Sequence, residues 1–279
     1  MKEIHVEVGN LNLLTDTKEW EVGIGLMDTL KIFWGSHNNL SNFPDQLECC
    51  IQLTEINLSS NTIGSLSEGI RNLVHLEYAF LAKNDIRFIP DSCSERISLQ
   101  HLDVSQNCLQ VLPKSMNGWR KPLITLNLDY NKLKELPHTL KDLVKVKDLF
   151  CSNNSVSLIS LNIGMMVELR SLTLNHNLLE NLPGNFSECR KLQLLEMDNN
   201  HFKLIPSGLS QLFKLSKFST CYNGICQTHE IGSLISIVVI NFSSNNLQLF
   251  PTEHLRLSKL VYLNLSYNHI EIIPKDKNA

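Results

Sequence analysis

Three residues in the last third of the chain are of the types that bind zinc: Cys221, Cys226 and His229. Thiolate sulfur and imidazole nitrogen are usual zinc ligands, but a structural site needs closely spaced ligand pairs, and no second pair follows here. Cys221 is predicted at an exposed strand position and Cys226 beyond the next turn, so one ion could reach both only with unusual geometry. The sequence therefore predicts no metal site and no bound cofactor.

The other arrangements that support catalysis are absent from the sequence. The chain contains neither G-x-x-x-x-G-K-[ST] nor G-x-G-x-x-G, and its 12 glycines are scattered. It also lacks G-x-S-x-G and H-E-x-x-H. Cys50, Cys151 and Cys189 fall at apolar positions, where we expect inert core residues. We therefore predict no catalytic residues, and a protein that is not an enzyme.

The composition is that of an ordinary globular protein. The 279 residues are 43% hydrophobic and 19% charged, with a net charge of -3, which excludes a disordered chain and a dedicated polyanion binder. The N-terminus does not read as a signal peptide, and no apolar run of about 18 residues predicts a membrane span. The eight cysteines form no paired framework. We expect a cytoplasmic protein with reduced thiols, a nuclear location being the alternative.

One short pattern recurs along the chain, L-x-x-L-x-L-x-x-N-x-I-x-x-I-P in its last copy. Successive copies are 22 to 24 residues apart, and 23 is the usual spacing. Eleven asparagines mark the copies: Asn38, Asn61, Asn84, Asn107, Asn131, Asn154, Asn177, Asn200, Asn223, Asn245 and Asn268. The alternating apolar residues predict a short strand with one buried side. The asparagine is suited to a turn in which it bonds neighbouring backbone, and the apolar pair with proline directs the chain to the opposite side.

This pattern resembles that of the leucine-rich repeat proteins, from about Leu30 to the end of the chain. The 23-residue spacing with L-P-x-x-L is most similar to the intracellular class found in Ras-pathway scaffolds and scribble-like polarity proteins. The resemblance implies an α/β solenoid, a horseshoe of about eleven repeats. It would have a parallel sheet on its concave face and short helices or extended turns on its convex face. Because architecture unites this family, the resemblance implies binding and no particular reaction.

The repeat pattern also predicts the domain boundaries and three irregular places. Residues 1–29 are predicted to form a degenerate first repeat or a partial cap, and residues 30–279 the repeat domain, with no obvious C-terminal cap. The polar ending is either a minimal cap or the sign of a longer protein, and we favour the second. Ser67 and Ser160 stand where other repeats have proline, and the ninth repeat lacks the Leu-Pro pair. Ordinary drift and a local contact site both explain such departures.

The exposed strand positions are the candidate interaction surface. They hold all five tyrosines together with several other aromatic and acidic residues, and aromatic side chains are typical anchors of protein interfaces. The candidate partner-binding residues are Trp34, Tyr78, Phe80, Asp103, Asp129, Tyr130, Asp148, Phe150, Glu196, Asp198 and Tyr222. Packing of these aromatics on one another is the alternative explanation.

The charges on these positions favour a protein partner over nucleic acid. Seven acidic residues stand against five basic ones, so the basic stripe that phosphate binding requires is missing. We predict a scaffold or adaptor in intracellular signalling whose concave face binds a partner that offers basic and apolar side chains. The main alternative is the regulatory or targeting region of a larger kinase, cyclase or phosphatase. The sequence leaves the oligomeric state open.

Overall fold

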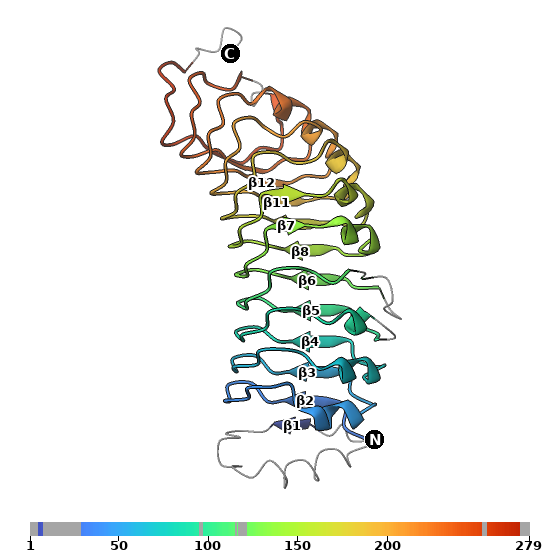
Figure 1. Ribbon diagram of the computed structural model, residues 1–279. Helices are drawn as coiled ribbons and strands as arrows, with labels where there is room; N and C mark the ends of the chain where they lie inside the picture. The colour runs from blue at the N-terminus through green and yellow to red at the C-terminus, as the bar shows by residue number, and fades with distance from the viewer. Residues whose placement is uncertain are drawn as a thin grey trace. The chain divides into compact units, whose positions relative to one another are not determined.

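The computed structural model describes residues 5–7, 29–94, 97–114, 116, 122–252 and 256–273, with residues 5–7, 92 and 94 as backbone only. The chain divides into two compact units. Unit 1 comprises residues 1–133 and 142–146, and unit 2 comprises residues 134–141 and 147–279. Each unit is a stretch of solenoid built from stacked repeats (Figure 1).

Unit 1 is built on parallel strands of three residues that lie side by side in chain order. Each strand pairs with the next in the register that places equivalent residues of neighbouring repeats opposite each other, as Tyr78 stands opposite His101. The strands are β1 (His5–Glu7), β2 (Ile32–Trp34), β3 (Glu55–Asn57), β4 (Tyr78–Phe80), β5 (His101–Asp103) and β6 (Thr125–Asn127).

Unit 2 continues the same arrangement with six strands of three residues, again parallel and in chain order. These are β8 (Asp148–Phe150), β10 (Ser171–Thr173), β11 (Leu194–Glu196), β12 (Lys217–Ser219), β13 (Val239–Asn241) and β14 (Tyr262–Asn264). A second, two-stranded parallel sheet joins β7 (Glu135–Leu136) to β9 (Leu158–Ile159).

The return segments contain short 3-10 helices, and the described residues contain no α-helix. A 3-10 helix rises more per residue than an α-helix, so it crosses the repeat with few residues. The helices are η2 (Asp45–Cys49), η3 (Glu68–Asn72), η4 (Asp91–Ser94), η5 (His138–Asp142), η6 (Leu161–Met165), η7 (Gly184–Glu188), η8 (Leu209–Gln211) and η9 (His229–Ser233). The predicted short helices are confirmed, and no described helix is long and apolar enough to cross a membrane.

The core of each unit consists of stacked apolar side chains between strands and helices. The middle residue of each three-residue strand from β2 to β13 is buried, as the alternating pattern predicts. In the irregular ninth repeat, Phe218 replaces the usual leucine and packs edge to face on Phe242, with ring centroids 5.6 Å apart. The predicted core cysteines, Cys50, Cys151 and Cys189, are buried.

The repeat asparagines form a ladder of side-chain hydrogen bonds through each unit. In unit 2, Asn177 Nδ2 donates to Cys151 O of the preceding repeat at 2.8 Å and to Leu174 O of its own repeat at 3.1 Å. Its Oδ1 accepts from Val156 N at 2.9 Å. The ninth-to-tenth repeat junction keeps this pattern despite its shorter spacing, because Ile225 N reaches the Oδ1 of the next asparagine at 2.9 Å. The asparagines thus satisfy backbone groups that the stack would otherwise bury without partners.

The residue before each repeat asparagine has a left-handed backbone. All eleven have φ between 52° and 59°, and none is glycine. Such a conformation costs an L-residue about 1–2 kcal/mol, and the asparagine ladder next to it offsets this cost. The residues are His37, Ser60, Lys83, Gln106, Tyr130, Asn153, His176, Asn199, Tyr222, Ser244 and Tyr267.

The two serines that replace proline are helix caps. Ser67 Oγ accepts from Gly69 N at 3.2 Å at the start of η3, and Ser160 Oγ accepts from Asn162 N at 3.3 Å at the start of η6. Serine is among the preferred residues at this position. These substitutions exchange the rigidity of proline for a capping hydrogen bond.

The predicted cap at residues 1–29 lies largely outside the described residues. Within it, β1 pairs in parallel with β2, His5 standing opposite Ile32. The polar end after residue 273 also lies outside the described residues. Both boundaries stay predictions.

Candidate interaction surface

The outward side chains of the strands, with the residues between each strand and its asparagine, form what we call the sheet face. In the three-residue strands, the middle side chain enters the core and the two flanking side chains point outward. Because the register is strict, equivalent residues form columns, and neighbouring strands lie about 4.8 Å apart. Trp34, Asn57, Phe80 and Asp103 form one such column in unit 1.

Two exposed aromatic residues of unit 1 are held by neighbouring strands. Trp34 Nε1 donates to Glu55 Oε1 at 2.7 Å. The Tyr78 ring stacks on His101, with centroids 4.8 Å apart and planes 2° from parallel. Each aromatic side chain is thus fixed by a residue of the next repeat while staying exposed. Such residues lose little side-chain freedom when a partner binds.

A polar residue at the end of several strands closes the following turn. Asn57 Oδ1 accepts from Ser59 N at 3.0 Å, and Asp103 Oδ1 accepts from Ser105 N at 2.9 Å. Asn127, Asn241 and Asn264 form the same bond two residues on. The carboxylate of Asp103 is therefore already engaged on one oxygen.

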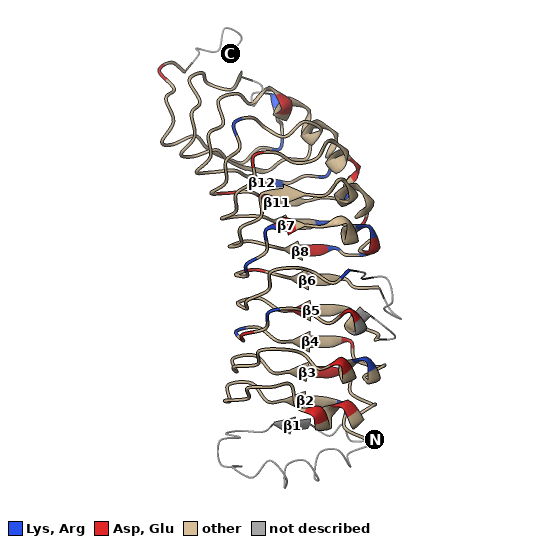
Figure 2. Ribbon diagram, in the orientation of Figure 1, with Lys and Arg blue, Asp and Glu red and all other residues tan. Residues whose placement is uncertain are grey.

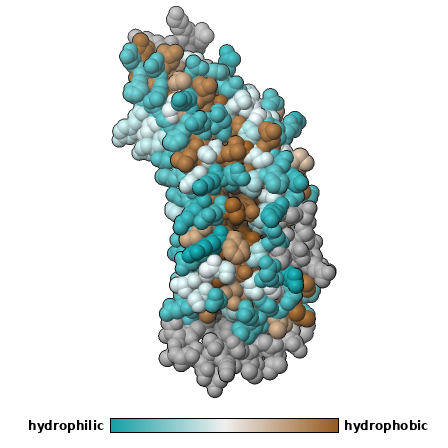
Figure 3. Space-filling model, in the orientation of Figure 1, coloured by the Kyte–Doolittle hydropathy of each residue, from teal (hydrophilic) through white to brown (hydrophobic). Residues whose placement is uncertain are grey.

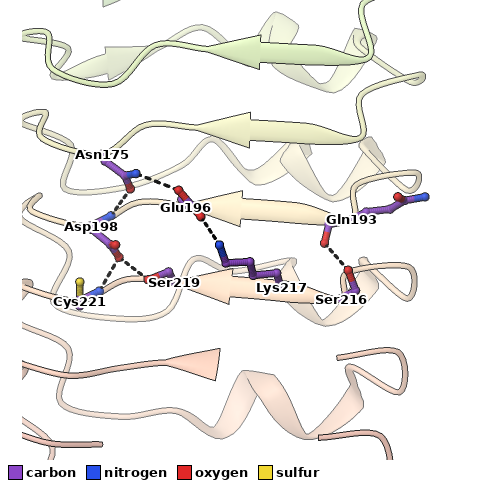
Figure 4. Close-up of polar contacts among 8 residues, drawn as sticks. All are labelled: Asn175, Gln193, Glu196, Asp198, Ser216, Lys217, Ser219 and Cys221. Carbon is purple, nitrogen blue, oxygen red and sulfur yellow. Dashed lines mark hydrogen bonds and ion pairs between the residues drawn. The ribbon is translucent and has the colours of Figure 1, made fainter. Parts of the chain in front are cut away.

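In the seventh to ninth repeats of unit 2, a network across repeats takes the place of these local turns, as Figure 4 shows. Asn175 Oδ1 accepts from Asp198 N at 2.8 Å, and Asp198 Oδ1 accepts from Cys221 N at 2.8 Å and from Ser219 Oγ at 2.6 Å. The acceptor for each of these backbone donors comes from the preceding repeat, because Glu196 and Ser219 occupy the strand-end position where other repeats have asparagine or aspartate.

Two of the candidate acidic residues of unit 2, Glu196 and Asp198, have side-chain partners within the chain. Glu196 Oε1 forms an ion pair with Lys217 Nζ at 2.6 Å, and Glu196 Oε2 accepts from Asn175 Nδ2 at 3.1 Å (Figure 4). Together with the bonds to Asp198, these contacts leave less negative charge for a partner than the sequence suggests.

The predicted residues take different places in the two units. Trp34, Tyr78, Phe80 and Asp103 lie on strands of unit 1, whereas Asp148, Phe150 and Glu196 lie on strands of unit 2. Asp129 and Asp198 follow their strands. Since they belong to two units, these residues are described as two surfaces, one on each unit.

The prediction that every tyrosine occupies a strand position is wrong for Tyr130, Tyr222 and Tyr267, the last of which has φ of 56° in the turn after β14. The two candidate binding residues among them, Tyr130 and Tyr222, lie in the left-handed turn before the asparagine, with φ of 55° and 52°, and both are exposed. Each of them stands three residues after the end of its strand, because the chain leaves the strand before it reaches the asparagine. Their role in binding stays a prediction.

The predicted exposure of Cys221 is also wrong. Cys221 is buried, and this burial, together with the neighbouring Asp198 carboxylate, raises the pKa of its thiol to about 12. A neutral thiol at physiological pH is a poor metal ligand and a poor nucleophile. The described residues contain no group of three or more potential ligands placed to hold a metal ion.

Sequence reasoning missed the residues that hold the candidate ones. His101, Glu55, Lys217 and Asn175 were not among the selected residues, although each contacts one of them. The sequence does indicate the contact of His101 with Tyr78, since His101 stands one repeat from Tyr78 at the same strand position. Asn175 likewise stands one repeat from Asp198 at the same position. The contacts of Trp34 with Glu55 and of Glu196 with Lys217 and Asn175 are diagonal, so equivalent positions alone do not reveal them.

The charges and apolar side chains are mixed on the surface. In the view of Figure 2, basic and acidic residues are scattered along each unit, and the basic ones form no continuous stripe. On the face drawn in Figure 3, hydrophobic side chains lie in patches bordered by hydrophilic ones. This mixture of apolar patches and polar borders is typical of protein interfaces.

Comparison with known proteins agrees with the architecture. The family profile Leucine Rich Repeat matches residues 52–73 and 259–276. The adenylate cyclase of Schizosaccharomyces pombe is 32% identical over 139 residues, which are 48% of this chain and 8% of the cyclase. The chain thus spans less than a tenth of this relative.

Two solved structures have a similar fold. An internalin, inlF, from Listeria monocytogenes matches with a TM-score of 0.70 and 20% identity, over 90% of this chain and 78% of that one. The plant peptide hormone receptor RGFR1 in complex with RGF2 matches with a TM-score of 0.65 and 26% identity, over 88% of this chain and 44% of that one.

Proposed function

Because the chain is a leucine-rich repeat protein, we propose that it is a non-catalytic scaffold or adaptor that binds a protein partner on its sheet face. The observation that carries this proposal is the pair of exposed aromatic residues in unit 1. Trp34 and Tyr78 are held by Glu55 and His101, so they are ordered before any partner arrives. Aromatic residues of this kind supply much of the binding energy at protein interfaces.

The partner is proposed to offer apolar side chains and basic groups. Unit 1 suits the basic groups of the proposed partner better than unit 2, because Glu196 of unit 2 is already paired with Lys217. A similar protein, RGFR1, was solved in complex with RGF2, which supports protein or peptide binding as the general mode. We place this role in intracellular signalling, on the resemblance of the repeats to the intracellular class.

A second candidate function is that these repeats are the regulatory or targeting region of a larger enzyme. The observation that favours it is the similarity to the adenylate cyclase, of which the matching stretch forms 8%. In that case the sheet face would still bind a protein, and the catalytic groups would lie outside these 279 residues. Both candidates therefore predict the same behaviour of the sheet face.

Photo-crosslinking tests the proposal. p-Benzoylphenylalanine placed at Tyr78 keeps an aromatic ring at the sheet face, and the same residue placed at Phe213, an exposed residue that follows η8, serves as the control. Irradiation of cells that express each variant should yield a specific crosslinked protein from position 78 and none from position 213. Equal crosslinking at both positions, or none at position 78, would contradict binding on the sheet face.

A further inference from the structure

A groove lies on the flank of unit 2, away from the sheet face. It is a cavity of about 530 Å³ lined by residues 157–161 of the sixth repeat and by residues 178 and 180–183 of the seventh. Three leucines at this groove are exposed: Leu158 by 60%, Leu161 by 65% and Leu178 by 46%. We call these residues the flank groove. A concave site with several exposed aliphatic side chains is unusual on a soluble surface and marks binding sites.

Two of these leucines break the repeat pattern. Leu161 directly follows the serine that replaces proline, and no other repeat carries an aliphatic side chain there. The equivalents are Asp45, Glu68, Asp91, Lys114, His138, Gly184, Ser207, His229, Thr252 and Lys275. Leu178 directly follows its repeat asparagine and is again the one aliphatic residue of its column. The equivalents are Asn39, Thr62, Asp85, Cys108, Lys132, Ser155, His201, Gly224, Asn246 and His269. Two exceptions from different columns and repeats thus line one groove.

One wall of the flank groove is the edge of a strand. On its inner side, β9 is paired with β7, and Ser157 N and Ser160 N donate to the preceding repeat at 3.0 and 2.9 Å. On the groove side, Leu178 N donates to Val156 O at 2.9 Å. Beyond that bond, none of the backbone hydrogen bonds among residues 157–160 and 179–183, all of them described, crosses the groove. At the far end of the groove, Asn185 Nδ2 of the seventh repeat donates to Leu161 O, so the two repeats that form the walls are joined at both ends.

The flank groove has a single charged residue among those that line it, Glu180. Glu180 is exposed and forms no hydrogen bond or ion pair with the described part of the chain. Its negative charge favours a basic residue in whatever binds here. The exposed apolar side chains and this carboxylate together define one kind of occupant.

We propose that the flank groove binds an extended segment of a partner protein, with alternating aliphatic side chains and one lysine or arginine. The aliphatic side chains would pack on Leu158, Leu161 and Leu178, and the basic group would meet Glu180. This second surface acts independently of the sheet face.

Peptide binding tests this assignment. The probes are fluorescein-labelled octapeptides that alternate leucine with threonine and carry one arginine at each threonine position in turn, with a matched set that carries glutamate instead. Fluorescence anisotropy should show that the best arginine peptide binds about tenfold more tightly than its glutamate counterpart. Glu180→Lys should reverse this preference, and Leu161→Asp or Leu178→Asp should weaken binding by at least about tenfold.

Leu204→Asp is the matched control, because Leu204 is an exposed leucine of the next repeat that does not line the groove. It should leave peptide binding unchanged, and circular dichroism should show that all variants are folded. The proposal is overturned if no arginine peptide binds, if arginine and glutamate peptides bind equally, or if Leu161→Asp has no effect. Light scattering that shows a wild-type dimer dissociated by Leu161→Asp would also overturn it, since a second copy would then fill the groove.

Discussion

Removal of one rung of the asparagine ladder should destabilise unit 2 strongly. Asn177 is only 4% exposed, and its side chain forms short bonds to Cys151 O, Leu174 O and Val156 N. Asn177→Ala removes all three and leaves buried backbone groups without partners. With a net contribution of about 1 kcal/mol for each bond, the free energy of unfolding should fall by about 3 kcal/mol.

Urea denaturation followed by circular dichroism measures this loss, with Asn181→Ala as the control. Asn181 belongs to the same repeat but is exposed, so its replacement should cost less than about 0.5 kcal/mol. Hydrogen exchange should also become faster at Val156 in the Asn177→Ala protein, because its amide loses its acceptor. Equal stability of the two variants would refute the view that the ladder holds the repeats together.

Three further predictions concern single residues. Lys83→Gly should raise the free energy of unfolding by about 1 kcal/mol, because glycine adopts the left-handed conformation without strain; a thermal melt that shows no gain would contradict this. Ser160→Ala should lower the free energy of unfolding by about 1 kcal/mol, because it removes the cap on Asn162 N. An unchanged free energy of unfolding would show that water replaces the cap. Burial raises the pKa of the Cys189 thiol to about 12. A thiol reagent at pH 8 should therefore label the exposed Cys226 and spare Cys189. Because the thiol ionises more easily in the unfolded chain, the free energy of unfolding should fall as pH rises from about 9 toward 12.

The repeat fold could be predicted from the sequence because the residues that produce it, the core leucines and the turn asparagines, recur at a regular spacing. Leu172, for example, is buried between its neighbours in β8 and β11, as the alternation of apolar residues requires. The spacing of the asparagines also fixes the strand register, since each asparagine bonds one repeat back. Ser160 could not be interpreted in this way, because the loss of proline is visible in the sequence whereas the capping bond that replaces it is not.

The candidate surface was less predictable because it depends on contacts between side chains. The sequence places Glu196 at an exposed strand position, but not the Lys217 ammonium group that pairs with it at 2.6 Å. It also places Tyr222 next to the asparagine without showing the left-handed turn. Periodicity gives the column of each residue, whereas diagonal contacts and turn conformations depend on three-dimensional geometry.

The affinity of a crosslinked partner for sheet-face variants tests the central claim most directly. Once the partner captured at position 78 is purified, calorimetry should show that Trp34→Ala and Tyr78→Ala each weaken binding by at least about tenfold. The groove variant Leu161→Asp should bind that partner as the wild type does. Unchanged affinity of both aromatic variants would contradict a sheet face that binds its partner through these side chains.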